Sequence, residues 1–157
     1  MPELAPPLVK LIFVVHLLST LFMVGLIWFV QVVHYPLFAK VGPAEFLAYE
    51  NAHTFLTTFV VMPPMLLEIG TAVLLAVFAR PEGVSPVLAW AGLALVLVIW
   101  LSTFLLQVPQ HEILGSGFAE PPHRFLVMSN WVRTLAWSAR GVILGVMVWQ
   151  AMDGGPR

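Results

Sequence analysis

Long apolar runs alternate with short polar or proline- and glycine-containing stretches along the whole chain. Four of these runs reach the length of about 20 residues that a helix needs to cross a bilayer. Their expected bounds are residues 8–33, 54–79, 86–108 and 125–152. Because a bilayer offers the backbone no hydrogen-bond partners, such segments must be helical. The pattern therefore predicts an all-α integral membrane protein, a bundle of four transmembrane helices that forms one domain over residues 1–157.

Prolines and glycines mark most of the expected breaks. Tyr35-Pro36 is expected to turn the chain after the first span, and Pro109 to end the third. Pro63-Pro64 lies inside the second span and should kink it. Residues 43–51 are either a short interfacial helix or the first turns of the second span, and residues 115–122 read as a loop.

An even number of spans places both termini on one side of the membrane, here called side A, and the opposite face is side B. The cations near side A are Lys10, Arg80 and Arg157, and those near side B are Lys40 and Arg124 with Arg133 just inside. The positive-inside rule then predicts cytoplasmic termini, in the inner membrane if the source is a bacterium. The N-terminus lacks the basic region of a signal peptide and its apolar run is too long for one, so we expect the first span to be retained.

The composition agrees with a membrane protein and narrows its partners. Hydrophobic residues make up 60% of the chain and charged residues only 10%, whereas a soluble domain carries about 25% charged residues. The net charge of -1 gives no basic surface for nucleic acid. The absence of cysteine excludes disulfides and thiolate metal sites. The expected partners are the lipid bilayer and a hydrophobic small molecule, and association with further copies of the chain is left open.

Polar residues inside the apolar runs fall at two depths. His16 and His34 are 18 residues apart, as are Glu50 and Glu68, and 18 residues are five turns of an α-helix. Polar side chains in a membrane helix face the bundle interior. The group expected near side B is Gln31, His34, Glu50, His53, Gln107, His111, Glu112, Asn130 and Arg133. The group expected nearer side A is His16, Glu68 and Arg140.

Arg140 and Glu68 lie at matched depths on antiparallel spans. An isolated charge this deep costs about 3 kcal/mol or more on insertion scales. The sequence therefore predicts that the two residues pair, with His16 close by. Such a pair can serve helix packing alone.

The side-B group contains the candidate chemistry. Glu50-Asn51-Ala52-His53 is a Glu-x-x-His motif, which puts a carboxylate and an imidazole on one helix face and occurs twice in di-metal bundle sites. Here it occurs once, so His34, Glu50, His53 and His111 are predicted ligands of a single iron, copper or zinc ion. The alternatives are hydrogen-bonded interfacial histidines and an acid/base pocket without any cofactor. Glu112 should point away from the site.

The second half of the chain resembles the anthrone oxygenase-like family of small four-span membrane proteins. The resemblance rests on T-F-L-L-Q-V-P-Q-H-E-I-L from Thr103 to Leu114 and on N-W-V-R-T-L-A-W from Asn130 to Trp137, with a looser match at Gly25 to Phe38. This chain has Gln107 and His111 where that family tends to have Asn. The resemblance implies a four-helix bundle and oxidation of a hydrophobic phenolic substrate by O2, an activity that is not associated with a metal.

Three functions compete at this stage. The first is a membrane oxidoreductase or oxygenase for an aromatic or lipid-like substrate. In it the metal ligands or bases are His34, His53 and His111, and Glu50 is a ligand or proton acceptor. Asn130 and Arg133 hold negative charge that develops on a substrate oxygen. The second is an ion- or proton-handling or transport protein that uses both depths as a relay, although no inverted repeat is present. The third is a non-catalytic assembly subunit whose polar groups join helices.

Overall fold

The computed structural model describes residues 5–153, and these residues contain helices and connecting turns but no strand. They form four continuous helical segments, here called spans 1 to 4. Span 1 comprises α1 (Pro6–Phe29), the π-turn η1 (Val30–His34), α2 (Tyr35–Leu37) and the 3-10 turn η2 (Phe38–Lys40). Span 2 is α3 (Pro43–Val77). Span 3 comprises α4 (Pro86–Ser102), the π-turn η3 (Thr103–Gln107) and α5 (Val108–Leu114), and span 4 is α6 (Glu120–Asp153).

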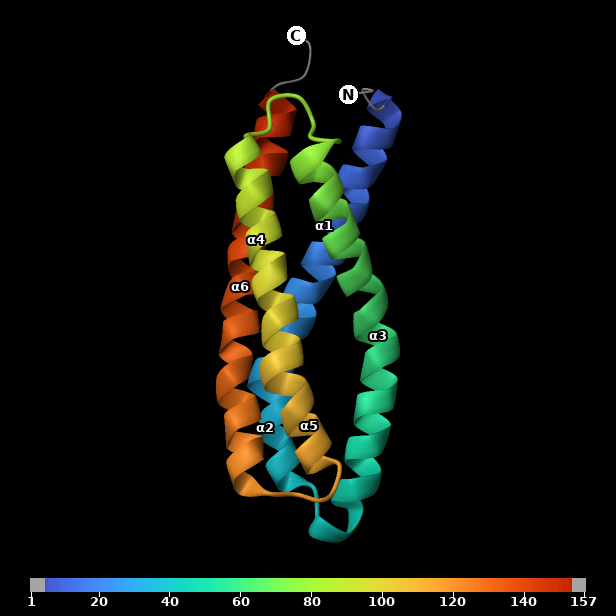
Figure 1. Ribbon diagram of the computed structural model, residues 1–157, viewed down its shortest axis with the longest axis vertical. Helices are drawn as coiled ribbons and strands as arrows, with labels where there is room; N and C mark the ends of the chain where they lie inside the picture. The colour runs from blue at the N-terminus through green and yellow to red at the C-terminus, as the bar shows by residue number, and fades with distance from the viewer. Residues whose placement is uncertain (1–4, 154–157) are drawn as a thin grey trace.

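The spans lie side by side as an elongated bundle (Figure 1). The start of α1 and the end of α6 lie at one end of the bundle, which is side A, and α2 and α5 lie at the other, side B (Figure 1). All four spans are long and apolar enough to cross a membrane. The prediction of an all-α, four-helix integral membrane bundle is confirmed. Arg157 lies outside the described residues, as do residues 1–4 and 154–156.

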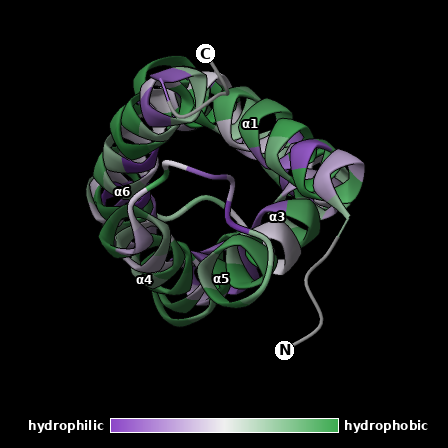
Figure 2. Ribbon diagram, turned by 90° about the horizontal axis from the view of Figure 1, so that it is seen from above, coloured by the Kyte–Doolittle hydropathy of each residue, from purple (hydrophilic) through white to green (hydrophobic). Residues whose placement is uncertain are grey.

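The bundle is apolar outside and polar within. Leu18, Phe59, Leu105 and Leu135 are each at least 60% exposed, one from every span. Seen along the bundle axis, hydrophobic ribbon dominates all four columns (Figure 2). Exposing this much apolar surface to water would cost free energy, whereas contact with lipid tails does not. The distribution fits contact with a bilayer.

Two expected breaks were wrong. The chain does not turn at Tyr35-Pro36, because span 1 stays helical to Lys40 and reverses at residues 41–42. Pro109 does not end span 3, which continues to Leu114. A π-turn immediately precedes each proline-containing segment. The wider turn relieves the clash between the proline ring and the preceding turn, so the helix continues.

Spans 2 and 4 are longer than expected. Residues 43–51 form the first turns of α3, which resolves the alternative in favour of a single helix. Pro63 and Pro64 lie within α3 without interrupting it, and the helix is bowed rather than straight (Figure 1). Helix α6 begins at Glu120, within the stretch expected to be a loop. The extra turns carry the helices well beyond the hydrocarbon core, which is about 30 Å thick.

An apolar layer separates the two depths at which polar residues occur. All four spans contribute to it, and every member is at most 3% exposed: Met23, Ile27, Met65, Ile99 and Trp137. Among these side chains, Trp137 makes a hydrogen bond towards side A: its indole nitrogen donates to Glu68 at 2.9 Å. The polar clusters are therefore two separate sites rather than one continuous channel of polar groups.

Candidate functional site

A line of hydrogen bonds near side B joins one residue from each span. Nη2 of Arg133 donates to the phenolic oxygen of Tyr35 at 3.2 Å. That oxygen lies 3.0 Å from Nε2 of His111, whose Nδ1 lies 2.5 Å from Oε1 of Glu50. Arginine can only donate, so each group donates to the next when His111 carries its proton on Nδ1. The line therefore runs from the guanidinium to the carboxylate.

Glu50 stands at the end of this line, and one of its two carboxylate oxygens takes no part in it. The residue is 0% exposed, and within residues 5–153 its Oε2 has no hydrogen-bond partner. A buried carboxylate oxygen without a partner costs free energy. An unsatisfied buried group of this kind marks a place where a ligand, water or proton is expected.

Two further histidines pack beside the line. Nε2 of His34 lies 2.8 Å from Nδ1 of His53, which also lies 3.0 Å from the hydroxyl of Thr57. The rings of His53 and His111 are 5.2 Å apart between centroids. The structure thus brings together His34, Glu50, His53 and His111, as the depths and spacings predicted.

Arg133 is held by neutral groups only. Its Nε and Nη2 donate to Oδ1 of Asn130 at 2.9 and 2.5 Å, and Nη1 donates to the hydroxyl of Thr103 at 3.3 Å. Within residues 5–153 it forms no ion pair. Arg133 is 7% exposed. Its charge is therefore uncompensated by any carboxylate in direct contact.

Asn130 orients this arginine. It is 0% exposed, and its amide nitrogen donates to Oε1 of Gln31 at 2.9 Å while its oxygen accepts from Arg133. The side chain lies among the protein's own groups and is not among those that line the adjacent cleft. Asn130 therefore positions Arg133, and its contact with a substrate oxygen stays a prediction.

Gln107 and Glu112 complete the predicted side-B group. Gln107 is buried and has both ends of its amide occupied, accepting from Ser102 and donating to Ser129 at 3.0 Å each. Glu112 is exposed, as expected at a rim, but it lines the adjacent cleft and does not point away from the site. Gln107 therefore joins spans 3 and 4, and Glu112 lies at the rim.

A π-turn places the polar face of span 3. The N–H of Val108 donates to the carbonyl of Thr103, five residues back. Over eight residues a regular α-helix would rotate His111 by about 80° from Thr103. The wider turn absorbs that rotation, and Thr103, Gln107 and His111 all line the same cleft.

This cleft has a volume of about 640 Å³ and lies between α3 and span 3, with Arg133 and Tyr35 also in its wall. Its size is that of a typical small-molecule site. Glu50, His53 and His111 stand at its polar end. His34 is outside the lining and reaches the cleft only through His53.

Sequence reasoning missed two residues of the site. Tyr35 was interpreted only as part of a turn, and His123 was not considered. Nε2 of His123 lies 2.8 Å from the backbone carbonyl of Tyr35 and fixes the end of span 1. A tyrosine inside an apolar run needs a partner for its hydroxyl, and that requirement was the available signal.

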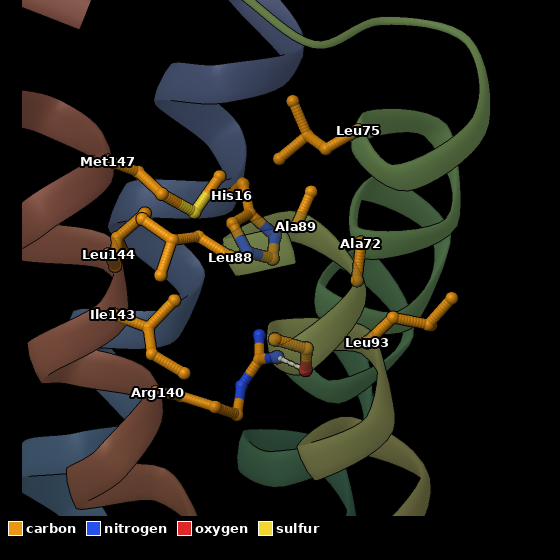
Figure 3. Close-up of a pocket in the computed structure, with 11 residues that line it drawn as sticks. His16, Ala72, Leu75, Leu88, Ala89, Leu93, Arg140, Ile143, Leu144 and Met147 are labelled. Atoms are coloured by element: carbon orange, nitrogen blue, oxygen red, sulfur yellow. Dashed lines mark hydrogen bonds between the residues drawn. The ribbon is translucent and has the colours of Figure 1, made fainter. Parts of the chain in front are cut away.

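The second polar site, towards side A, contains the predicted ion pair. Nη2 of Arg140 lies 3.1 Å from Oε1 of Glu68, and both residues are 2% exposed, which confirms the pairing. Arg140 also donates to the carbonyl of Gly92, and Trp137 donates to Glu68 at 2.9 Å. His16 and Arg140 both line a cavity of about 10 Å³, large enough for about one water molecule (Figure 3).

The donor set near side B could hold a metal only after rearrangement. Within residues 5–153 no three histidine or carboxylate groups are arranged around a common ion position. Nε2 of His34 and Nδ1 of His53 are directed at each other, and both nitrogens of His111 have protein partners. The metal site stays a prediction, and the geometry as folded is that of a hydrogen-bonded acid/base cluster.

No family model matches the chain, and no curated protein or solved structure is significantly similar to it. The resemblance to the anthrone oxygenase-like family therefore stays a prediction. The class of protein that the fold defines is an integral membrane four-helix bundle.

Proposed function

We propose that this protein is a membrane oxidoreductase that uses O2 to oxidise a hydrophobic aromatic or lipid-like molecule bound in the cleft. The observation that carries the proposal is the unpartnered Oε2 of Glu50, at the end of the line from Arg133 and beside a cleft of about 640 Å³. A carboxylate held on one oxygen by an imidazole can accept a proton on the other.

Each residue of the line has a distinct role in this proposal. Glu50 is the general base that removes a proton from the substrate, and His111 holds it in position. Arg133 stabilises the oxyanion that forms, because its hydrogen-bond partners within residues 5–153 are all neutral. Asn130 is a positioning residue for Arg133.

The redox step balances with O2 as the oxidant. Loss of the proton leaves an electron-rich anion, which O2 oxidises. When a methylene becomes a carbonyl, one oxygen atom of O2 enters the product and the other leaves as water with the two hydrogens. The protein supplies the base, the oxyanion partner and a site from which the apolar walls exclude bulk water.

The apolar layer supports an enzyme over a transmembrane relay. A relay needs polar groups or water at every depth, whereas Met23, Ile27, Met65 and Ile99 fill the level between the two sites. An assembly subunit would need neither the cleft nor an unpaired carboxylate oxygen. Both alternatives remain outcomes of the test.

Oxygen uptake by the protein in lipid nanodiscs tests the proposed reaction. Hydrophobic phenols and hydroxyl-bearing polycyclic aromatics should give O2 consumption together with a substrate absorbance change, above the rate in empty nanodiscs. Absence of both across the panel would overturn the proposal. Ion flux in proteoliposomes would then support the relay, and stable co-purification of a partner would support the subunit.

Elemental analysis tests the metal version of the same site. A single Glu-x-x-His motif predicts about one transition-metal ion per chain, and occupancy should fall at acidic pH because neutral imidazole is the ligand form. His53→Ala should lose the ion while helix content is unchanged. The matched control is His16→Ala, at the other polar site, which should keep it. Active wild-type protein without metal would leave the cofactor-free acid/base mechanism.

A further inference from the structure

The walls of the cleft are two facing stripes with the same helical spacing. The lining residues of α3 and of span 3 each recur at intervals of three and four, from Glu50 to Met65 on one side and from Trp100 to Gly115 on the other. Each stripe covers 15 residue steps, or about 22 Å at 1.5 Å per residue. The cleft is therefore elongated along the bundle axis.

Polarity changes steadily along this length. The side-B end has the carboxylate, the imidazoles and the guanidinium described above. The middle of the α3 wall is formed by threonines, Thr54, Thr57 and Thr58. The deep end is apolar and includes the adaptable side chains of two methionines: Val61, Met62, Met65, Trp100 and Phe104. A molecule that matches this gradient has a polar end and one apolar tail.

The cleft is open along the side of the bundle. Lining residues on both walls are exposed, including Met62 at 37% on α3 and Phe104 at 56% and Val108 at 37% on span 3. This side of a membrane-spanning bundle meets lipid tails. An amphiphile in the side-B leaflet already has its polar end at the surface and its tail towards the bilayer centre. It can enter sideways without turning over.

The polar end indicates which headgroup fits. Oε2 of Glu50 can accept a hydrogen bond from an O–H group, and Arg133, with neutral protein partners, can pair with the oxyanion that the same group forms. Both features suit an acidic hydroxyl, as in a phenol, and a carboxylic acid presents the same kind of group and can occupy the site as an analogue that does not react. A phosphocholine headgroup has an anionic phosphate oxygen but no O–H group, so it cannot donate to Oε2 of Glu50.

We infer that the cleft binds an elongated amphiphile with an acidic hydroxyl at its polar end and one apolar tail, taken laterally from the side-B leaflet. The inference rests on the proposed function for the roles of Glu50 and Arg133 and adds the substrate class. The bound molecule lies parallel to the bundle axis, with its tail between Thr58, Met62 and Phe104.

Photolabelling of the protein in phosphatidylcholine nanodiscs tests this placement. The probe is palmitic acid with a diazirine at mid-chain, and a second probe has the diazirine close to the carboxyl group. Mid-chain adducts should concentrate on Thr58, Val61 and Phe104, and head-proximal adducts nearer to Thr54. Exposed residues of α6 that face away from the cleft, Leu135 and Val142, report background labelling. Loss of labelling when a long-chain alkylphenol is added shows that a phenol occupies the same site as the fatty-acid probe.

A blocking variant tests the same inference by binding. Met62→Trp should reduce cleft labelling at least tenfold, and Val142→Trp, an equally bulky change on an outward position that is 70% exposed, should leave it unchanged. Phe104→Trp on the opposite wall repeats the test if the first variant loses helix content. Labelling that is uniform over all lipid-facing surfaces, or a reversed order of head and tail adducts, would overturn the inference.

The outcomes separate this inference from the proposed reaction. Photolabelling needs no turnover, so cleft labelling without oxygen uptake would reject the oxidoreductase and keep the amphiphile site. Oxygen uptake with uniform labelling would keep the reaction and reject the amphiphile site.

Discussion

Replacing Glu50 with glutamine is expected to lower turnover by about 100- to 10,000-fold, the usual contribution of a general base. Glutamine has the same shape, and its amide oxygen can still accept from Nδ1 of His111, so the contact that is now 2.5 Å long can survive. What is lost is the ability to take up a proton. Oxygen uptake in nanodiscs, measured at saturating substrate, reports the change.

Glu112→Gln is the matched control for this experiment. Glu112 also lines the cleft, but it is exposed at the rim and accepts no hydrogen bond from His111. The identical change of charge there should alter turnover less than about threefold, as expected of a screened surface charge. Similar losses in both variants, or full activity in Glu50→Gln, would show that Glu50 is not the base.

Arg140→Leu is expected to destabilise the detergent-solubilised protein by about 3–5 kcal/mol, the cost of leaving a buried partner uncompensated. Among residues 5–153, the change leaves Glu68 with Trp137 as its only side-chain donor. Adding Glu68→Leu should recover part of the loss, because a buried ion pair replaced by apolar residues is often close to neutral. Unfolding in a denaturing detergent, monitored by helix content, gives the change in unfolding free energy for Arg140→Leu, for Glu68→Leu and for the double variant.

Arg80→Leu is the control for the arginine itself. Arg80 is exposed in the turn between α3 and α4, and its replacement should change stability by less than about 0.5 kcal/mol. A double variant that is as unstable as the sum of the two single variants would contradict a coupled Arg140–Glu68 pair.

The fold was predictable because the bilayer restricts it so strongly. Four apolar runs of spanning length admit only helices, and antiparallel spans match residues by depth. Matching residues by depth was enough to predict the pair of Arg140 and Glu68, in which Nη2 and Oε1 lie 3.1 Å apart. It also brought His34, His53 and His111 to one place, since their positions near side B leave few alternatives.

The helix ends and the finer roles were not predictable in the same way. Pro36 and Pro109 suggested breaks, because the usual rule for proline assumes a regular turn before it. The π-turns that remove the clash have no recognised signature in the sequence. The partners of Asn130 were not predicted either: its amide nitrogen donates to Gln31 from span 1. Such partners depend on side-chain rotation, which depth matching does not determine.

The two π-turns have a consequence for comparing this chain with others. Each occupies five residues and is followed, at the second position, by Pro36 or Pro109. A π-turn holds one residue more than the α-turn it replaces. A relative with a regular helix there should align only with a one-residue gap, and without that gap every position between the turn and side B would be assigned to the wrong helix face. The gap itself would then distinguish chains that keep this polar end from chains that share only the bundle.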